Sequence, residues 1–115
     1  MAGAAELAAG RYDAAVLLAV HGGISSSDAV SIAVGGRRST DPDHAYAATL
    51  LEQVGHNAEP FKQQATRLRT LVALKNRVSY EDKLATQKDA ETCIRRCEQL
   101  VAWAQNELIR ARLLP

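Results

Sequence analysis

The chain has 115 residues and a formal net charge of +1, with 47% hydrophobic and 23% charged residues. This length suits one domain, and the composition is typical of a folded globular protein, which excludes an intrinsically disordered chain. The balanced charge excludes a protein that coats nucleic acid non-specifically, although a local basic patch is compatible with it. Because aromatic residues make up only 4%, the core has to be built from Ala, Leu, Val and Ile.

The cysteines and the apolar runs predict a soluble cytoplasmic protein that does not cross a membrane. The start of the chain, residues 1–6, lacks the basic region of a secretory signal. The most apolar run, Ala14 to Val20, has seven residues, and roughly 20 are needed to span a bilayer. Cys93 and Cys97 lie in one helical stretch, where a disulfide is geometrically awkward, so both are interpreted as reduced thiols.

The first segment, residues 4–21, is rich in alanine and apolar around most of a helical circumference, which predicts a buried central helix. Gly22-Gly23 then favours a break, because Ser25 and Asp28 have the spacing of a capping box for a second helix over 26–34. The alternative is one continuous helix through the glycines, at a cost of roughly 1 kcal/mol for each. In either case Gly35-Gly36 is expected to end this segment.

Three further helices are predicted after residues 37–43, which form a loop. Asp41-Pro42 is typical of the N-cap and first position of a helix that runs to residue 54. A helix that begins at residue 60 carries apolar residues at three- and four-residue steps to 78. The last and longest helix is expected from residue 80 or 82 to 113. Short connections favour antiparallel neighbours, so the predicted fold is an all-α, antiparallel bundle of four to five helices.

Metal and cofactor motifs are absent from the sequence. The two glycine pairs follow predicted helices rather than strands and match neither a Walker motif nor a dinucleotide fingerprint. His21, His44 and His56 are isolated, and Cys93 with Cys97 would supply only two of the four ligands of a zinc site. We therefore expect no bound metal and no cofactor, and we interpret both thiols as small apolar core residues.

The most informative stretch is residues 74–82, where polar side chains follow an apolar run at the end of the predicted fourth helix. Asn76 and Tyr80 are four residues apart and share a helix face, with Lys75 beside it. A cation, an amide and a phenol gathered at a helix end suit the binding of a phosphate or a base. They suit equally a cap that holds the turn into the next helix, and the pattern alone favours this structural interpretation.

Basic residues also recur in pairs near helix ends or on polar faces. Such pairs are usually solvated surface, and a groove that holds RNA phosphates is the alternative. The pairs are Arg37-Arg38, Arg67 with Arg69, Lys75 with Arg77, and Arg95-Arg96.

Residues 74–82 resemble the signature region of the HEPN superfamily, which consists of small helical-bundle domains often found as RNases. The signature is an Arg, then a polar residue that is often Asn, and a few residues later a His, late in a central helix. Here Lys75 stands at the Arg position, Asn76 at the polar position and Tyr80 at the His position. The sequence looks most similar to a variant group that has a Tyr at the His position, in an acidic context.

Other parts of the chain resemble the same family. Gly10-Arg11-Tyr12 before an alanine-rich helix looks like its first helix, and Gly35-Gly36, a short loop and His44 look like its middle. The long closing helix also matches, so the resemblance covers roughly residues 10–108. It implies a single HEPN-like helical domain over residues 1–115.

The resemblance implies a metal-independent RNase site in which Lys75, Asn76 and Tyr80 are the catalytic candidates. Asp28 or His44 would supply the missing base if the fold brought either near Tyr80. Lys75 lacks the bidentate fork of an arginine. A phenol, with an ordinary pKa of about 10, is a poor substitute for an imidazole of about 6.5. We therefore expect weak or absent RNase activity, with Arg37, Arg38 and Arg77 as RNA-binding candidates.

The same resemblance implies a homodimer with its cleft at the subunit interface, RNA or a nucleotide as ligand, and a nucleotidyltransferase-like partner in a toxin–antitoxin system. Two alternatives stay open. One is a non-enzymatic dimerisation or protein-interaction module that uses an apolar helix face, with residues 75–80 structural. The other is a regulatory bundle that binds a small nucleotide with the same polar cluster.

Overall fold

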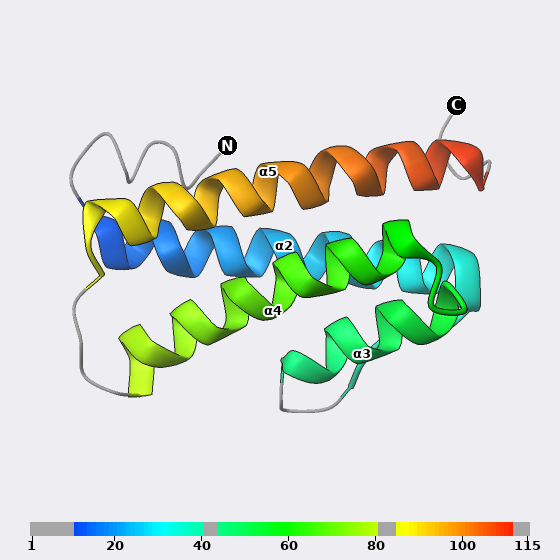
Figure 1. Ribbon diagram of the computed structural model, residues 1–115, viewed down its shortest axis with the longest axis horizontal. Helices are drawn as coiled ribbons and strands as arrows, with labels where there is room; N and C mark the ends of the chain where they lie inside the picture. Colours follow the sequence, from blue (N-terminus) through cyan, green and yellow to red (C-terminus); the bar gives the residue numbers. More distant parts are fainter. Residues whose placement is uncertain (1–10, 41–43, 81–84, 112–115) are drawn as a thin grey trace.

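The structure, a computed structural model, describes residues 11–40, 44–80 and 85–111, apart from the side chains of 79 and 80. Within these ranges it contains no strand and has four helices: α2 (Tyr12–Gly35), α3 (Ala45–Val54), α4 (Glu59–Tyr80) and α5 (Gln87–Arg110). They pack into one bundle (Figure 1). The predicted all-α helical bundle is confirmed.

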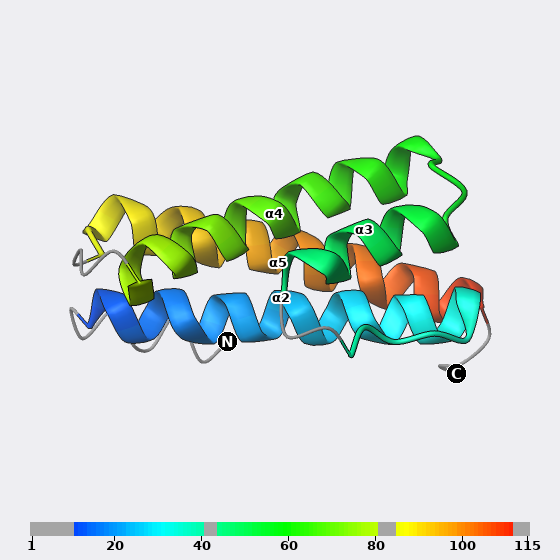
Figure 2. The ribbon, with the colours of Figure 1, turned by 90° about the horizontal axis from the view of Figure 1, so that it is seen from below.

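The helices do not simply alternate in direction. α2 and α5 lie side by side and run the same way, whereas α4 runs in the opposite direction (Figures 1 and 2). Residues 36–40 run back along α2, so α3 begins beside the middle of α2 and runs parallel to it. The pairs α3–α4 and α4–α5 are therefore antiparallel, whereas α2 and α3 are parallel. The backbone of residues 36–40 runs back along α2, so α3 begins again in the direction of α2.

The core is aliphatic, as the composition predicted. Leucine and valine side chains from all four helices are its largest members, and aromatic rings lie at its edge. Phe61 on α4 and Trp103 on α5 pack edge to face, with ring centroids 5.1 Å apart and planes at 89°. The fully buried leucines and valines are Leu50, Leu51, Leu68, Leu71, Leu100, Val16, Val20 and Val30.

The predicted break at Gly22-Gly23 is wrong, and the continuous helix is correct: α2 passes through both glycines for 24 residues. Ser25 and Asp28 are therefore inside the helix and form no capping box at its start. The reason is packing. A Cβ on Gly23 would lie 2.7 Å from Leu71 Cδ1 and 3.4 Å from Leu100 Cδ1. The missing side chain lets α4 and α5 approach α2 closely, and this burial offsets the low helix propensity of glycine.

The predicted start of the last helix at residue 80 or 82 is also wrong, because α4 continues to Tyr80 and α5 begins at Gln87. A capping box fixes this start. The Asp89 backbone N–H donates to Thr86 Oγ1 at 3.0 Å, and the Thr86 N–H donates to Asp89 Oδ2 at 3.1 Å. The Thr86-x-x-Asp89 spacing carries this signal in the sequence. With 24 residues each, α2 and α5 are equally long, so α5 is not the single longest helix.

The other helix ends lie near their predicted positions. Gly36 closes α2 in the left-handed conformation, with φ at 67°. α3 begins at Ala45, later than predicted, and the expected cap at Asp41-Pro42 lies outside the described residues. α4 begins at Glu59, one residue before Pro60. These ends set which residues face the seam between α4 and α5.

The length and composition of α2 would also allow it to cross a membrane, with a mean hydropathy of 1.3 over its most apolar window. A central helix of a bundle has the same properties, and α2 packs here against α3, α4 and α5.

We expect Gly23→Leu to lower the free energy of unfolding by about 2 kcal/mol, because the added side chain overpacks the site next to Leu71 and Leu100. Urea denaturation followed by circular dichroism measures this change. Gly22→Leu is the control, since Gly22 is only half-buried in the same helix. Equal stability of the two variants would contradict a close approach at Gly23.

Candidate functional site

The residues predicted from the family signature lie along the last turns of α4. Lys75 is half-buried and has an interaction partner, and Asn76 is exposed. Tyr80 is the last residue of α4, and its side chain lies outside the described residues. All three belong to one helix, as the sequence predicted, and this part of α4 is close to the start of α2 (Figure 1).

Arg77, predicted to bind RNA, forms an ion pair with Asp89. Its Nη2 lies 2.6 Å from Asp89 Oδ2 and ties the end of α4 to the start of α5. The backbone N–H of Thr86 and the Arg77 guanidinium together hold the pKa of Asp89 below its ordinary value. The charge of Arg77 is therefore partly balanced by the carboxylate of Asp89.

A second group of predicted residues gathers around α2. Because residues 36–40 run back along this helix, Arg38 and His44 come within electrostatic reach of Asp28. Burial raises the pKa of Asp28, and the positive charges of Arg38 and His44 oppose part of that rise. Arg37 is exposed beside them. The sequence named these residues singly, and the chain reversal brings them together.

These two groups lie at different levels of the bundle. Gly23 of α2 is opposite Leu71 of α4, and the two helices are antiparallel. Lys75 is four residues from this contact in one direction, and Asp28 is five residues from it in the other. At a rise of about 1.5 Å per residue, the two are separated by roughly 14 Å along the bundle. Asp28 is therefore not placed to act as a base beside Lys75.

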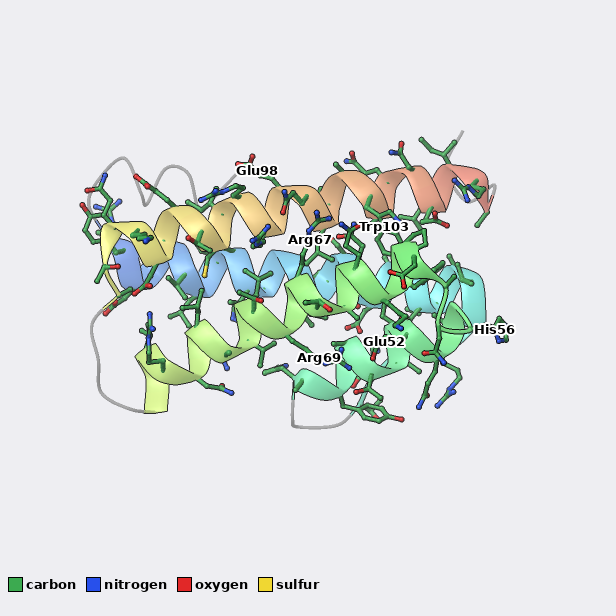
Figure 3. All side chains as sticks on the ribbon, in the orientation of Figure 1. Glu52, His56, Arg67, Arg69, Glu98 and Trp103 are labelled. Atoms are coloured by element: carbon green, nitrogen blue, oxygen red, sulfur yellow. The ribbon has the colours of Figure 1, made fainter. Side chains whose placement is uncertain are left out.

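A groove with a volume of about 720 Å³ lies on the seam between α4 and α5. Arg67 of α4 and Trp103 of α5 both lie at this seam (Figure 3). Its charged lining is three cations, Lys62, Arg67 and Arg96, with one acid, Glu59. The remaining lining residues are Pro60, Gln63, Gln64, Thr66, Thr70 and Trp103.

Two of the three cations of this groove, Arg67 and Arg96, have no acidic partner among the described residues. Arg67 has no ion-pair or hydrogen-bond partner among the described residues. Arg96 donates to the neutral amide oxygen of Gln99 at 3.2 Å, so its charge is not neutralised there. Arg69, the companion of Arg67, is different: it forms an ion pair with Glu52 at 2.5 Å and joins α4 to α3. The groove therefore favours anions.

A second hollow of about 550 Å³ continues along the same seam toward the end of α4. Thr70 lines both hollows, so they adjoin. Lys88 and the Arg77–Asp89 ion pair border this second one. The seam thus presents polar and basic side chains over much of its length.

Neither cysteine belongs to a reactive site. Burial raises the pKa of Cys93 to about 12 and that of Cys97 to about 11, which disfavours the thiolate at neutral pH. Both are fully buried on α5. Among the described residues, no group of three or more His, Cys, Asp or Glu side chains is arranged to hold a metal ion.

Sequence reasoning listed Arg67 and Arg96 only as members of basic pairs, and it missed the groove. A signal exists in the spacing. Gln64 and Arg67 are three residues apart on α4, and Arg96 and Trp103 are seven apart on α5, so each pair shares a helix face. Only the packing of α4 against α5 makes these two faces meet.

Comparison with known proteins finds no match: no family model, no curated protein and no solved structure is similar to this chain. The resemblance to the HEPN superfamily therefore stays a prediction that rests on the residues quoted for it.

We expect Asp28→Asn to raise the free energy of unfolding at pH 7. Burial raises the pKa of Asp28 above its ordinary 3.8, so the ionised carboxylate opposes folding at neutral pH and this penalty disappears in acid. The advantage of the variant over wild type should shrink as the pH falls through the raised pKa of Asp28, and it should be nearly gone below the ordinary value of 3.8. Urea denaturation across this pH range measures it.

Asp89→Asn is the control, because the pKa of Asp89 is lowered rather than raised. Its ionised form stabilises the fold above an ordinary pKa of 3.8, so this variant should lose stability at pH 7. A loss of stability in both variants would show that the charge on Asp28 favours folding.

Proposed function

We propose that this chain is an RNA-binding helical domain that holds single-stranded RNA along the α4–α5 seam and does not cleave it efficiently. One observation carries the proposal: Arg67 and Arg96 border the same groove as Trp103. Arginine is suited to phosphate oxygens, and an aromatic ring is suited to the face of a base. The local excess of cations explains how a chain of net charge +1 would bind a polyanion.

The combination favours a single strand over a duplex. In a double helix the faces of the bases are covered by their neighbours, so an indole ring has nothing to stack on. In a single strand the bases are accessible, and stacking contributes affinity with little dependence on sequence. The resemblance of residues 74–82 to the HEPN signature supports RNA rather than DNA.

The candidate catalytic residues support binding more than cleavage. Metal-independent cleavage requires a base poised near neutral pH next to the ribose 2′-hydroxyl. A phenol at residue 80 is not such a base. Asp28 lies roughly 14 Å along the bundle from Lys75. A HEPN-like domain with these replacements is best described as an RNA-binding relative of the RNases, with weak or no activity of its own.

The test is fluorescence anisotropy with a labelled, mixed-sequence single-stranded RNA in a chelator-containing buffer. We expect binding to wild type and intact RNA after the measurement. Arg67→Gln and Arg96→Gln should each weaken binding about tenfold, because each removes a charged hydrogen bond to phosphate. Each should also reduce the slope of log affinity against log salt by about 0.7.

The control is Arg95→Gln, since Arg95 is exposed on α5 and does not line the groove. It removes the same charge one residue away. If it weakened binding as much as Arg96→Gln, the RNA contact would be a diffuse charge effect. Absence of binding at low salt would contradict the proposed function, and rapid cleavage in chelator would contradict the inactive site.

A second candidate function, self-association without chemistry, is favoured by the outer face of α2. Leu18 and Ile32 are 39% and 49% exposed, and they lie 14 residues apart on one face of this helix. A second copy of the chain would cover them and form the homodimer that the family resemblance implies.

We expect Ile32→Lys to shift a dimer toward monomer in sedimentation equilibrium at micromolar concentration, because a charge would be buried between the copies. Ile109→Lys is the control: Ile109 is 52% exposed, but it lies on α5. A wild-type protein that sediments as a monomer would exclude this candidate.

A further inference from the structure

We infer that the two hollows on the α4–α5 seam form one track that holds about four to six nucleotides of a single strand, anchored at Trp103 and extending to Lys88. The inference rests on the proposed RNA binding and adds to it the length and the placement of the strand. Three observations carry it. The hollows adjoin, α4 and α5 keep one register along both of them, and each hollow offers a cation without an acidic partner among the described residues.

The pairing of α4 with α5 is constant along both hollows. Lys62 and Trp103 line the first hollow, and Arg77 and Lys88 line the second. Fifteen residues separate Lys62 from Arg77 on α4, and fifteen separate Lys88 from Trp103 on α5. At a rise of about 1.5 Å per residue, both counts give a length of about 22 Å. Thr70, midway along α4 between the two ends, lines both hollows, so the track is continuous.

A track of this length fits a short oligonucleotide. In a stacked strand each nucleotide advances about 3.4 Å along the axis, so about 22 Å holds roughly six nucleotides. An extended strand advances further with each nucleotide and uses fewer of them. About four is the lower end of the site sizes of domains that bind single strands. A single nucleotide would occupy only a fraction of the seam, so affinity should depend on the length of the strand.

The first hollow is the anchoring end of the track. Trp103 packs edge to face on Phe61, with ring centroids 5.1 Å apart, and it stays only partly buried at the groove. A ring that is already ordered loses little entropy when a base stacks on it. Arg67 and Arg96 line the same hollow without an acidic partner among the described residues. A strand too short to leave this hollow would therefore still bind here.

The second hollow supplies the contacts at the far end. Lys88, in the first turn of α5, is exposed and has no ion-pair partner in the described part of the chain, whereas its neighbour Asp89 pairs with Arg77. Leu74 of α4 adds an apolar lining that suits the face of a base. Eight residues separate Lys88 from Arg96. They span about 12 Å along α5, the length of roughly three to four stacked nucleotides, so only a longer strand reaches both cations.

The acids near the seam leave the track open to an anionic strand. Glu91 and Glu98 of α5 are exposed, line neither hollow and share one helix face at a spacing of seven residues. Figure 3 shows Glu98 on the side of α5 away from α4. Glu59 lines the first hollow, but it lies at the first turn of α4, beyond the end of the track.

The test is a length series of oligouridylates of two, four, six and twelve nucleotides, followed by quenching of Trp103, the only tryptophan in the chain. We expect the affinity to rise at least about tenfold from the dinucleotide to the hexanucleotide, because the longer strand adds phosphate contacts. From six to twelve nucleotides it should rise only with the number of positions at which the site can be placed on the strand. A dinucleotide that binds as tightly as the hexanucleotide would overturn the track.

Two variants separate the ends of the track. Lys88→Gln should weaken binding of the hexanucleotide about fivefold, reduce its salt slope by about 0.7 and leave the dinucleotide unchanged. Arg96→Gln should weaken the binding of both lengths. Arg95→Gln is the matched control, because Arg95 is exposed on α5 and lines neither hollow. Lys88→Gln removes a cation from the first turn of a helix, so the fold should persist, which circular dichroism checks.

Failure of the track and failure of RNA binding give different results. If the hexanucleotide binds with dependence on Arg96 and is insensitive to Lys88→Gln, the track is overturned and the RNA-binding proposal stands. Equal losses from Lys88→Gln at two and six nucleotides would likewise overturn the track, because they would show a diffuse effect of charge. Absence of binding at every length in low salt would overturn both proposals.

Discussion

The close contact of Gly23 with Leu71 and Leu100 determines where the other helices lie. A side chain at this point of α2 would push α4 and α5 outward, because the leucines it would meet are fully buried and have no free space around them. With only hydrogen at this position, both helices settle against the middle of α2. Their own seam, which carries the groove, is a consequence of that approach. The glycine that weakens the helix locally is thus the residue that allows the bundle to close.

Two arginines of α4 form ion pairs with acids of neighbouring helices, and two other arginines have no acidic partner among the described residues and line the groove. Arg69 forms an ion pair with Glu52 and Arg77 forms one with Asp89, so these two arginines join α4 to its neighbours. Arg67 and Arg96 meet no acid and border a hollow instead. Such ion pairs near the surface contribute little stability, but they do set which cations remain available to an anion. The net charge of the whole chain is close to zero, so it does not reveal that cations outnumber acids around the groove.

The structure separates two groups that the sequence placed under one function, and the basic groove lies apart from both. The signature residues lie near the end of α4, Asp28 of α2 lies within electrostatic reach of Arg38 and His44, and the basic groove lies toward the start of α4. A cleaving site needs its base and its phosphate-binding group at one scissile bond. A binding surface needs only cations and a stacking ring along the path of the strand. This arrangement suits recognition better than catalysis.

The sequence by itself determined that the chain is helical, that its core is aliphatic, and that three helices follow residue 40, although it placed the start of the last one at residue 80 or 82 and not at Gln87. These properties follow from local spacing, because a helix face and a cap are built from residues a few positions apart. Tertiary structure decided that α2 is continuous. The local sequence predicts a break at Gly22-Gly23, and only the packing of Leu71 against Gly23 explains why the helix passes through both glycines. It also decided which arginines have no acidic partner among the described residues and that side chains of α4 and α5 line one groove. Those facts depend on residues far apart in the chain, and no local pattern specifies which faces of two helices will meet.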